Sequence, residues 1–322
     1  MVSLKEIVEV TVKERNFLYT NAPVFLYPEW LDLFPKNTIS LVGIYDKGDS
    51  LIGGFCYFKG KKLGKTTLGT PQFFAHNGLF YINPSQSKAN KNTFDKKIMK
   101  AVCDYLKAQK TLFISLGFPH EIKDVQPFIW NNYNISLKYT YQIKLDQDPF
   151  KLLEQFSSER RKNITKAEKD NVRVELSEDY KQIESLVSKS INRKDAPVDK
   201  NILQKIIRDF STSNYSYSFV AYVKNKPSAT VFIVHDSKTA YYLLGGFDEF
   251  NKHQGAGAIC MWHAIQHAKN LGIKTFDFEG SMLPEVEKYF RGFGGDLKPL
   301  IQVHSASYFV QTLLKSRGKK GF

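Results

Sequence analysis

One segment in the second half combines glycines with basic and polar residues directly before an expected helix. The strand-like run Tyr241–Gly246 is followed by Lys252, His253, Gln254, Gly255, Ala256 and Gly257, and a helical pattern begins at Ala258. Free backbone N–H groups and the helix dipole bind phosphate at such a position, and glycine lets an anion approach closely. We therefore predict that this segment binds donor phosphates, although glycines before a helix also form simple turns. The segment is neither a P-loop nor a G-x-G-x-x-G fingerprint.

Two carboxylates lie at the end of the next expected strand, 274–278. Phe276 and Phe278 alternate with Asp277 and Glu279, so aromatic and acidic side chains should point to opposite faces. Because α/β sheets present their sites at the carboxyl ends of strands, either carboxylate could orient or deprotonate an ammonium group. The alternative is a solvated acidic face.

A short helix over 284–291 carries two further candidates and is followed by glycines. Tyr289 could protonate a leaving group, and Arg291 could neutralise a phosphate or carboxylate. Alternatively, Arg291 is only the favourable cation at a helix C-terminus. Arg160 and Arg161, in a highly charged helix, are expected to hold an anionic part of donor or acceptor. We expect the two carboxylates to share one cleft with Tyr289 and Arg291.

The elements that position these residues form a repeated series. The second half reads as strands at 218–223, 230–234 and 240–244, a helix from 258 to 271, and the strand 274–278. The first half has the same order, with strands at 40–45, 51–58 and 79–82, a helix around 98–105 and a strand at 111–116. Such a recurrence in 322 residues indicates a duplicated α/β domain.

The domain prediction places the join at the turn 145–149. Residues 1–145 are expected to form a degenerate domain on the acceptor side, because 85–90 lacks the glycines of the donor loop. Residues 146–322 should carry the donor loop and catalytic residues. Each domain is expected to have its own mixed, centrally split sheet, with the site in the interdomain cleft.

Composition narrows the class of protein. The formal net charge of +14 favours polyanionic partners, such as nucleic acid, nucleotide-linked substrates or an acidic membrane face. Cys56, Cys103 and Cys260 are far apart, which argues against a disulfide framework or a Cys-based zinc site. His263 and His267 lack the glutamate of an H-E-x-x-H motif, so no metal is expected. No apolar run is long enough to span a membrane, and we expect a cytoplasmic protein.

Several of these segments resemble a known family. Lys252–Gly257 resembles the acyl-CoA loop of GNAT proteins, Gln/Arg-x-x-Gly-x-Gly/Ala, with Lys252 at the first position. Phe276–Ser281 with Tyr289–Gly294 looks like the closing signature of FemAB-like proteins. The helix from Ser157, with Arg160, Arg161, Ile164 and Lys166, is similar to that family's Ser-x-x-Arg-Arg-x-Ile-x-Lys-Ala run.

The resemblance implies two tandem GNAT-like acyl-CoA N-acyltransferase domains in a mixed α+β fold. It also implies transfer of an acyl or aminoacyl group to an amine, with acyl-CoA or aminoacyl-tRNA as donor and a cell-wall precursor or small-molecule amine as acceptor. Two departures leave the choice of donor open. Phe290 stands where bridge-forming members have a lysine, and the second domain has no long helical hairpin. The alternative function is a non-catalytic pair of GNAT folds that binds an acidic ligand or partner.

Overall fold

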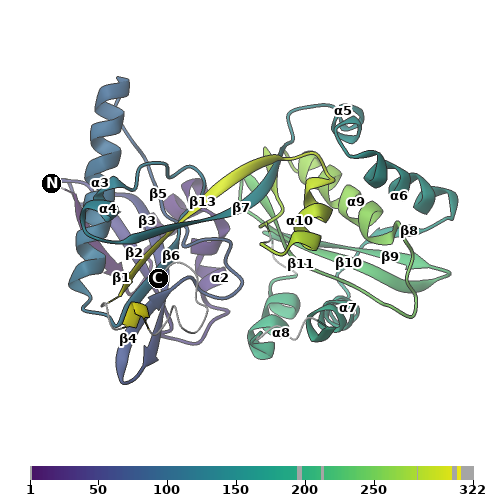
Figure 1. Cartoon of the computed structure of the whole chain (residues 1–322), viewed down its shortest axis with the longest axis horizontal. Helices are drawn as coiled ribbons and strands as arrows, with labels where there is room; N and C mark the ends of the chain where they lie inside the picture. The colour runs from purple at the N-terminus through teal and green to yellow at the C-terminus, as the bar shows by residue number, and fades with distance from the viewer. Residues whose placement is uncertain (1, 194–197, 212–213, 281, 307–309, 313–322) are drawn as a thin grey trace. The chain divides into compact units, whose positions relative to one another are not determined.

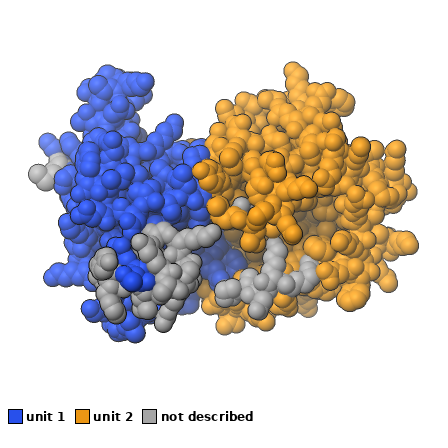
Figure 2. Space-filling model, viewed as in Figure 1, with its two compact units in different colours: residues 1–138, 299–322 blue, residues 139–298 orange. Residues whose placement is uncertain are grey.

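The computed structural model describes every residue except 1, 194–197, 212–213, 281, 307–309 and 313–322. The chain divides into two compact units. One comprises residues 1–138 and 299–322, and the other comprises residues 139–298 (Figure 2). These bounds differ from the expected 1–145 and 146–322, because the last strand carries the chain back into the first unit.

The first unit is a mixed sheet with helices. Its strands follow the order β1-β2-β3-β4-β6-β13, with β5 beside β3. They are β1 (Ser3–Ile7), β2 (Ile39–Tyr45), β3 (Leu51–Lys62), β4 (Lys65–Gly69), β5 (Phe80–Tyr81), β6 (Phe113–Gly117) and β13 (Asp296–Ala306). The helices are α1 (Val12–Asn21), the 3-10 turn η1 (Val24–Leu26), α2 (Pro28–Leu31), α3 (Lys88–Ala108) and α4 (Gln126–Trp130).

The second unit has the sheet order β7-β12-β11-β10-β9-β8. Its strands are β7 (Asn134–Lys144), β8 (Arg173–Leu176), β9 (Ser216–Val223), β10 (Lys226–His235), β11 (Thr239–Phe247) and β12 (Thr275–Asp277). Its helices are α5 (Pro149–Glu154), α6 (Ser158–Lys169), α7 (Tyr180–Arg193), α8 (Lys200–Asp209), α9 (Ala256–Asn270) and α10 (Pro284–Arg291). Helix α9 packs on β9 and β10 and also contacts α6, whereas α7 packs on β10 and β11 from the other face (Figure 1).

Both units contain the same crossover. In the first unit α3 connects the parallel strands β4 and β6, and in the second α9 connects the parallel strands β11 and β12. The remaining strand pairs that have a described register are antiparallel. The repeated series expected from the sequence is therefore present. The run 79–82 is not its parallel strand, however, because β5 pairs only with β3 and the unpredicted β4 pairs with β6.

The prediction of two separate sheets is wrong. Strands β7 and β13 each begin in one unit and end in the other, and they are neighbours in a single strand order that includes the strands of both units. The pairing of strands is therefore continuous through β7 and β13, where the sequence predicted a break between two sheets.

A cluster of aromatic rings holds β12 against α10 and the residues that follow it. The Phe278 ring stacks at 5.4 Å on Phe290 and at 5.3 Å on Phe293, and Phe293 packs edge-on against Phe156 at 5.2 Å. Offset and edge-to-face ring pairs of this kind add stability beyond the burial of their area. This packing fixes which face of β12 points toward α10. Among the described residues, no helix is both long and apolar enough to cross a membrane.

Candidate functional site

The expected donor loop leads into the N-terminus of α9, but its first N–H groups are not free. The Gly255 N–H donates to His253 Nδ1 at 3.0 Å, and the Ala256 N–H donates to the His253 carbonyl at 3.2 Å. His253 Nε2 in turn bonds Asp170 at 2.9 Å. The imidazole therefore closes the start of the loop, and these two N–H groups are not among the unpaired ones that the sequence predicted there.

Helix α6 also covers part of this N-terminus. A β-carbon at Gly255 would lie 2.0 Å from the Asn163 carbonyl oxygen, so glycine is required for the close approach of α6. Gly257 is different, because a β-carbon there would meet only the Tyr289 hydroxyl, at 3.4 Å. No side chain caps α9, and the described residues provide no hydrogen-bond acceptor for the Gly257 and Ala258 N–H groups. The open part of the helix N-terminus thus lies beside Tyr289.

Tyr289 is held between a guanidinium and aromatic rings. The Arg160 guanidinium lies 4.5 Å from the centre of the Tyr289 ring, and Phe293 packs edge-on against that ring at 5.2 Å. Burial raises the pKa of the Tyr289 phenol, and the nearby positive charge of Arg160 partly opposes that rise. The hydroxyl therefore keeps its proton far above neutral pH, as a proton donor must.

Arg160 is almost fully buried, with 8% of its side chain exposed. One guanidinium nitrogen bonds Glu159 at 3.1 Å, while Nε is buried without a hydrogen-bond partner in the described part of the chain. A β-carbon at Gly292 would lie 2.9 Å from this Nε, so the glycine leaves the room that the arginine occupies. Because buried donors are almost always paired, the free Nε is suited to an anionic ligand.

The parallel strands β11 and β12 separate beside this cluster. They pair only from Thr239–Thr275 to Tyr241–Asp277. Beyond that point β11 stays with β10 as far as Phe247, whereas the Phe278 N–H donates to the Tyr141 carbonyl of β7 at 3.0 Å. We call this divergence the fork. A register shift in β11 at Leu243 adds a bulge there, a feature common next to active sites.

The Asp277 side chain points to the other face of the sheet, and Glu279 lies beyond the end of β12. Asp277 is buried and accepts hydrogen bonds from Thr140 Oγ1, from Gln142 Nε2 at 2.8 Å and from the Glu279 N–H at 2.8 Å. Glu279 has a left-handed φ of 54°, and its Oε1 is buried without a partner among the described residues. Burial raises the pKa of Glu279 well above its ordinary value, and the negative charge of Asp277 raises it further.

The structure does not bring these carboxylates together with Tyr289 and Arg291. Strand alternation turns Phe276 and Phe278 toward the α10 side, so it turns Asp277 away from it. Glu279 follows the end of β12 with a left-handed φ of 54°, so alternation does not determine the direction of its side chain. Arg291 is largely exposed and pairs with Glu287 at 3.0 Å. The cluster at Tyr289 is therefore joined by Arg160, not by Arg291.

Arg161 also has a role within the fold. Its guanidinium donates to the carbonyls of Glu154 and Phe156, both at 2.7 Å, and so closes the C-terminal end of α5. The described residues contain no group of three or more His, Cys, Asp and Glu side chains that could hold a metal ion. His263 and His267 pack against the Phe219 ring at 5.9 and 5.6 Å.

Comparison with known proteins finds a matching domain family and a matching fold. Residues 155–291 match the family model described as an acetyltransferase (GNAT) domain. The crystal structure of FemX superposes with a TM-score of 0.68 at 14% identity, over 96% of this chain and 98% of that one. The matched residues of the second unit form a GNAT-like domain, and the chain shares the fold of FemX. The tandem GNAT-like fold expected from the sequence is thereby confirmed.

Two further solved structures share the fold. A conserved protein of unknown function from Bacteroides thetaiotaomicron has a TM-score of 0.60 at 11% identity, over 94% of this chain and 99% of that one. The structure of L-PGS from Bacillus licheniformis has a TM-score of 0.55 at 11% identity, covering 86% and 88% of the two chains. At these identities the likeness shows the fold alone. A search of curated proteins finds no match.

The GNAT-like domain contains one site residue that the sequence analysis missed. Tyr242 lies at the fork, and burial, together with the nearby Tyr289, raises the pKa of its phenol. A β-carbon at Gly245 would lie 1.7 Å from the Tyr242 hydroxyl, so this glycine makes room for that ring. Gly245 and Gly246 belong to β11 rather than to a loop, and a glycine pair inside a strand run was the available signal.

Proposed function

We propose that this protein is an N-acyltransferase that moves an acyl or aminoacyl group from an activated donor to an amine. The observation that carries the proposal is the pairing of a partly buried, protonated Tyr289 with the open first turn of α9, next to the fork. A proton donor beside unpaired backbone N–H groups suits a reaction in which negative charge develops on a carbonyl oxygen and a leaving atom.

The donor side of this site is the α9 face of the sheet. The residues there fit an activated acyl donor, because the Gly257 and Ala258 N–H groups, the helix dipole and Arg160 all favour negative charge. The donor supplies an acyl carbon bonded to a leaving sulfur or oxygen, as in acyl-CoA or aminoacyl-tRNA. Since His253 and α6 occupy the start of the loop, the proposed donor contacts are restricted to the end of Lys252–Gly257.

On the acceptor side, Glu279 is the proposed base. Its free Oε1 would take a proton from the acceptor ammonium, and the neutral amine would then attack the acyl carbon at the fork. A C–N bond forms, the bond to the leaving atom breaks, and Tyr289 donates its proton to that atom. The proton that the nitrogen loses on becoming an amide then restores the Tyr289 phenol. Asp277 is a positioning residue, because it holds the Glu279 backbone through its N–H.

The first unit is proposed as the acceptor-side domain. Its crossover helix α3 is capped by Ser87, whose hydroxyl accepts from the Asn90 N–H at 3.3 Å, whereas α9 has no side-chain cap. A capped helix start offers less to an anionic donor. This proposal includes a cell-wall precursor or small-molecule amine as acceptor, tRNA as part of the donor, and peripheral contact with an acidic membrane. They are supported by the FemAB-like fold and by a structural neighbour from Agrobacterium fabrum titled putative lysylphosphatidylglycerol synthetase.

The test is a donor-by-acceptor screen followed by mass spectrometry of the acylated amine. Tyr289→Phe should lower kcat by about 10²–10⁴ with the best pair, the range for loss of a general acid. Tyr222→Phe is the matched control, because Arg173 covers the Tyr222 ring at the same 4.5 Å but on strand β9. Equal rates for parent and Tyr289→Phe would remove the assigned proton donor. Binding of donors without any turnover would favour the non-catalytic alternative.

The carboxylates are tested by pH–rate profiles. Glu279→Gln should abolish the limb that reports deprotonation of the base, because the amide cannot accept that proton. Asp277→Asn should shift the limb and lower the rate less, since it acts through Glu279. If both variants keep the parental rate and profile, the amine is activated in another way.

A further inference from the structure

The connection between β11 and α9 carries a completely exposed aromatic ring. Phe250 is 100% exposed, and Phe247, at the end of β11, is 37% exposed. A single exposed apolar side chain is common on protein surfaces and by itself indicates nothing. What distinguishes Phe250 is the backbone that carries it.

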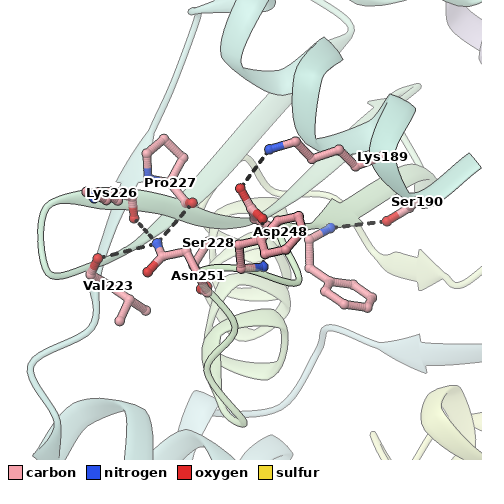
Figure 3. A network of polar contacts seen from close by, with 10 residues as sticks. Lys189, Ser190, Val223, Lys226, Pro227, Ser228, Asp248 and Asn251 are labelled. Carbon is pink, nitrogen blue, oxygen red and sulfur yellow. Dashed lines mark hydrogen bonds and ion pairs between the residues drawn. The ribbon is translucent and has the colours of Figure 1, made fainter. Parts of the chain in front are cut away.

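Asn251 fixes that backbone on one side. Its amide nitrogen donates to the carbonyls of Lys226 at 2.8 Å and Pro227 at 3.1 Å, with a longer contact to that of Val223 at 3.4 Å (Figure 3). The Asn251 carbonyl also accepts the Ser228 hydroxyl at 2.6 Å. The turn between β9 and β10 thereby holds the residue that follows Phe250.

Asp248 fixes the other side. Its carboxylate accepts the Phe250 N–H at 2.9 Å and pairs with Lys189 of α7 at 2.7 Å, and its own N–H donates to the Ser228 carbonyl at 2.8 Å (Figure 3). The Phe247 N–H donates to the Ser190 hydroxyl at 3.1 Å. The loop is thus ordered before any ligand arrives, which removes the entropy cost of ordering it on binding.

A cation lies near the other exposed ring of this loop. Lys252 Nζ lies 5.6 Å from the centre of the Phe247 ring, and Lys252 follows Phe250 by two residues. Phe250 also lies three residues before His253, at the start of the proposed donor loop. An aromatic face beside cations is the chemistry by which proteins bind nucleotides, with the base stacked and the phosphate neutralised.

We propose that Phe250 is a stacking platform for the adenine base of the acyl donor. The inference rests on the proposed transferase function and assigns the recognition of the donor's nucleotide to this loop. Coenzyme A and an RNA whose 3′ end is adenosine share this chemistry, so the probes below distinguish the two sources. A bare anion would be bound by the lysines and the helix N-terminus without the ring.

Direct titration of the full chain tests the proposal without requiring turnover. The probes are coenzyme A, 4′-phosphopantetheine, which lacks the nucleotide, and a single-stranded RNA octamer that ends in adenosine. Phe250→Ala should weaken binding of coenzyme A, of the RNA or of both by about 5- to 100-fold, the usual effect of losing one stacked base. Binding of 4′-phosphopantetheine should change less than about twofold.

Four further variants separate stacking from other causes. Phe250→Trp should retain binding and Phe250→Leu should not, because leucine is apolar but has no aromatic face. Phe150→Ala is the matched control, since Phe150 is a 73% exposed phenylalanine of α5 in the same unit, and it should bind as the parent does. Asn251→Ala should weaken binding through loss of the ordered loop, with Phe250 itself intact.

The proposal is overturned if Phe250→Ala leaves all affinities unchanged, if it weakens 4′-phosphopantetheine equally, or if the parent binds neither base-bearing probe. It is also overturned if Phe250→Ala changes only the binding of anionic phospholipid vesicles, which would identify the ring as a membrane contact. Failure of the transferase proposal is recognised separately. In that case the base-bearing probes would bind through Phe250, but no acyl donor, with or without the nucleotide, would be turned over.

Discussion

Two glycines two residues apart, Gly255 and Gly257, should respond in opposite ways to the same added methyl group. A β-carbon at Gly255 would lie 2.0 Å from the Asn163 carbonyl oxygen and 2.9 Å from the Ala167 β-carbon. A normal contact needs at least 3.4 Å, so α6 must move by more than 1 Å or the helix start must open. Overpacking of this kind typically costs about 1–3 kcal/mol of unfolding free energy. Gly255→Ala should therefore destabilise the protein.

Gly257→Ala should leave the fold intact. Its β-carbon would lie 3.4 Å from the Tyr289 hydroxyl, an ordinary contact, and alanine is the better helix former by about 0.5–1 kcal/mol. The methyl group would, however, fill the space between the unpaired N–H groups and Tyr289. We expect unchanged or slightly increased stability together with a lower kcat/KM for the best donor.

Urea unfolding of both variants, followed by tryptophan fluorescence, gives the two free energies, and the donor assay gives the two activities. Gly272→Ala provides a reference, because Gly272 has a φ of 79° and no neighbour within 4 Å, so its cost is backbone strain alone. Equal stability for Gly255→Ala and parent would refute the close packing of α6 on the start of α9. A Gly257→Ala variant with full activity would refute the placement of the donor beside Tyr289.

Three further outcomes are expected. As pH rises above 4.5, the Glu279→Gln variant should become more stable relative to the parent, by at most about 1.4 kcal/mol per pH unit. The reason is that the raised pKa of Glu279 in the folded parent disfavours loss of its proton, whereas the variant has no proton to lose. Paired urea titrations of the two proteins from about pH 5 to 8 measure this difference. Burial lowers the pKa of His76 and of His304 to about 4. As pH falls from 6.5 to 4, each histidine should therefore reduce the free energy of unfolding by up to about 3 kcal/mol, and His304→Gln should reduce this loss in acid unfolding curves. Arg160→Met should change stability by less than about 1 kcal/mol but reduce kcat, because a poorly paired buried charge contributes little to folding; an equal kcat would show that Arg160 only packs.

Local sequence signals predicted some elements of the second unit but not β8, α7 and α8. Apolar runs predicted β9, β10 and β11, helical spacing predicted α9, and the short helix expected over 284–291 is α10. The missed strand β4 has the sequence Lys65-Thr66-Thr67-Leu68-Gly69, with a single large apolar side chain. Its strand state depends on pairing with β3 and β6, which local periodicity does not contain.

The candidate site was predicted in part, and its failures have a common cause. The sequence named Tyr289, Arg160 and Glu279 as candidates, which stays a prediction, but it grouped Tyr289 with Arg291 because the two are close along α10. On a helix, residues two apart do not share a face, and Arg291 turns to Glu287 at i−4 instead. Gly255 was interpreted as an anion contact, but its space is taken by α6, which is 92 residues earlier at Asn163. Long-range packing of this kind leaves no local signal.

In the proposed reaction the acid Tyr289 and the base Glu279 act on different atoms, the leaving atom of the donor and the nitrogen of the acceptor. Strands β11 and β12 pair only as far as Tyr241 and Asp277, and we propose that the acyl carbon lies at the fork beyond these residues. It follows that a bulky side chain at Gly245, where the Tyr242 hydroxyl already fills the space, should block transfer even though no catalytic group is altered.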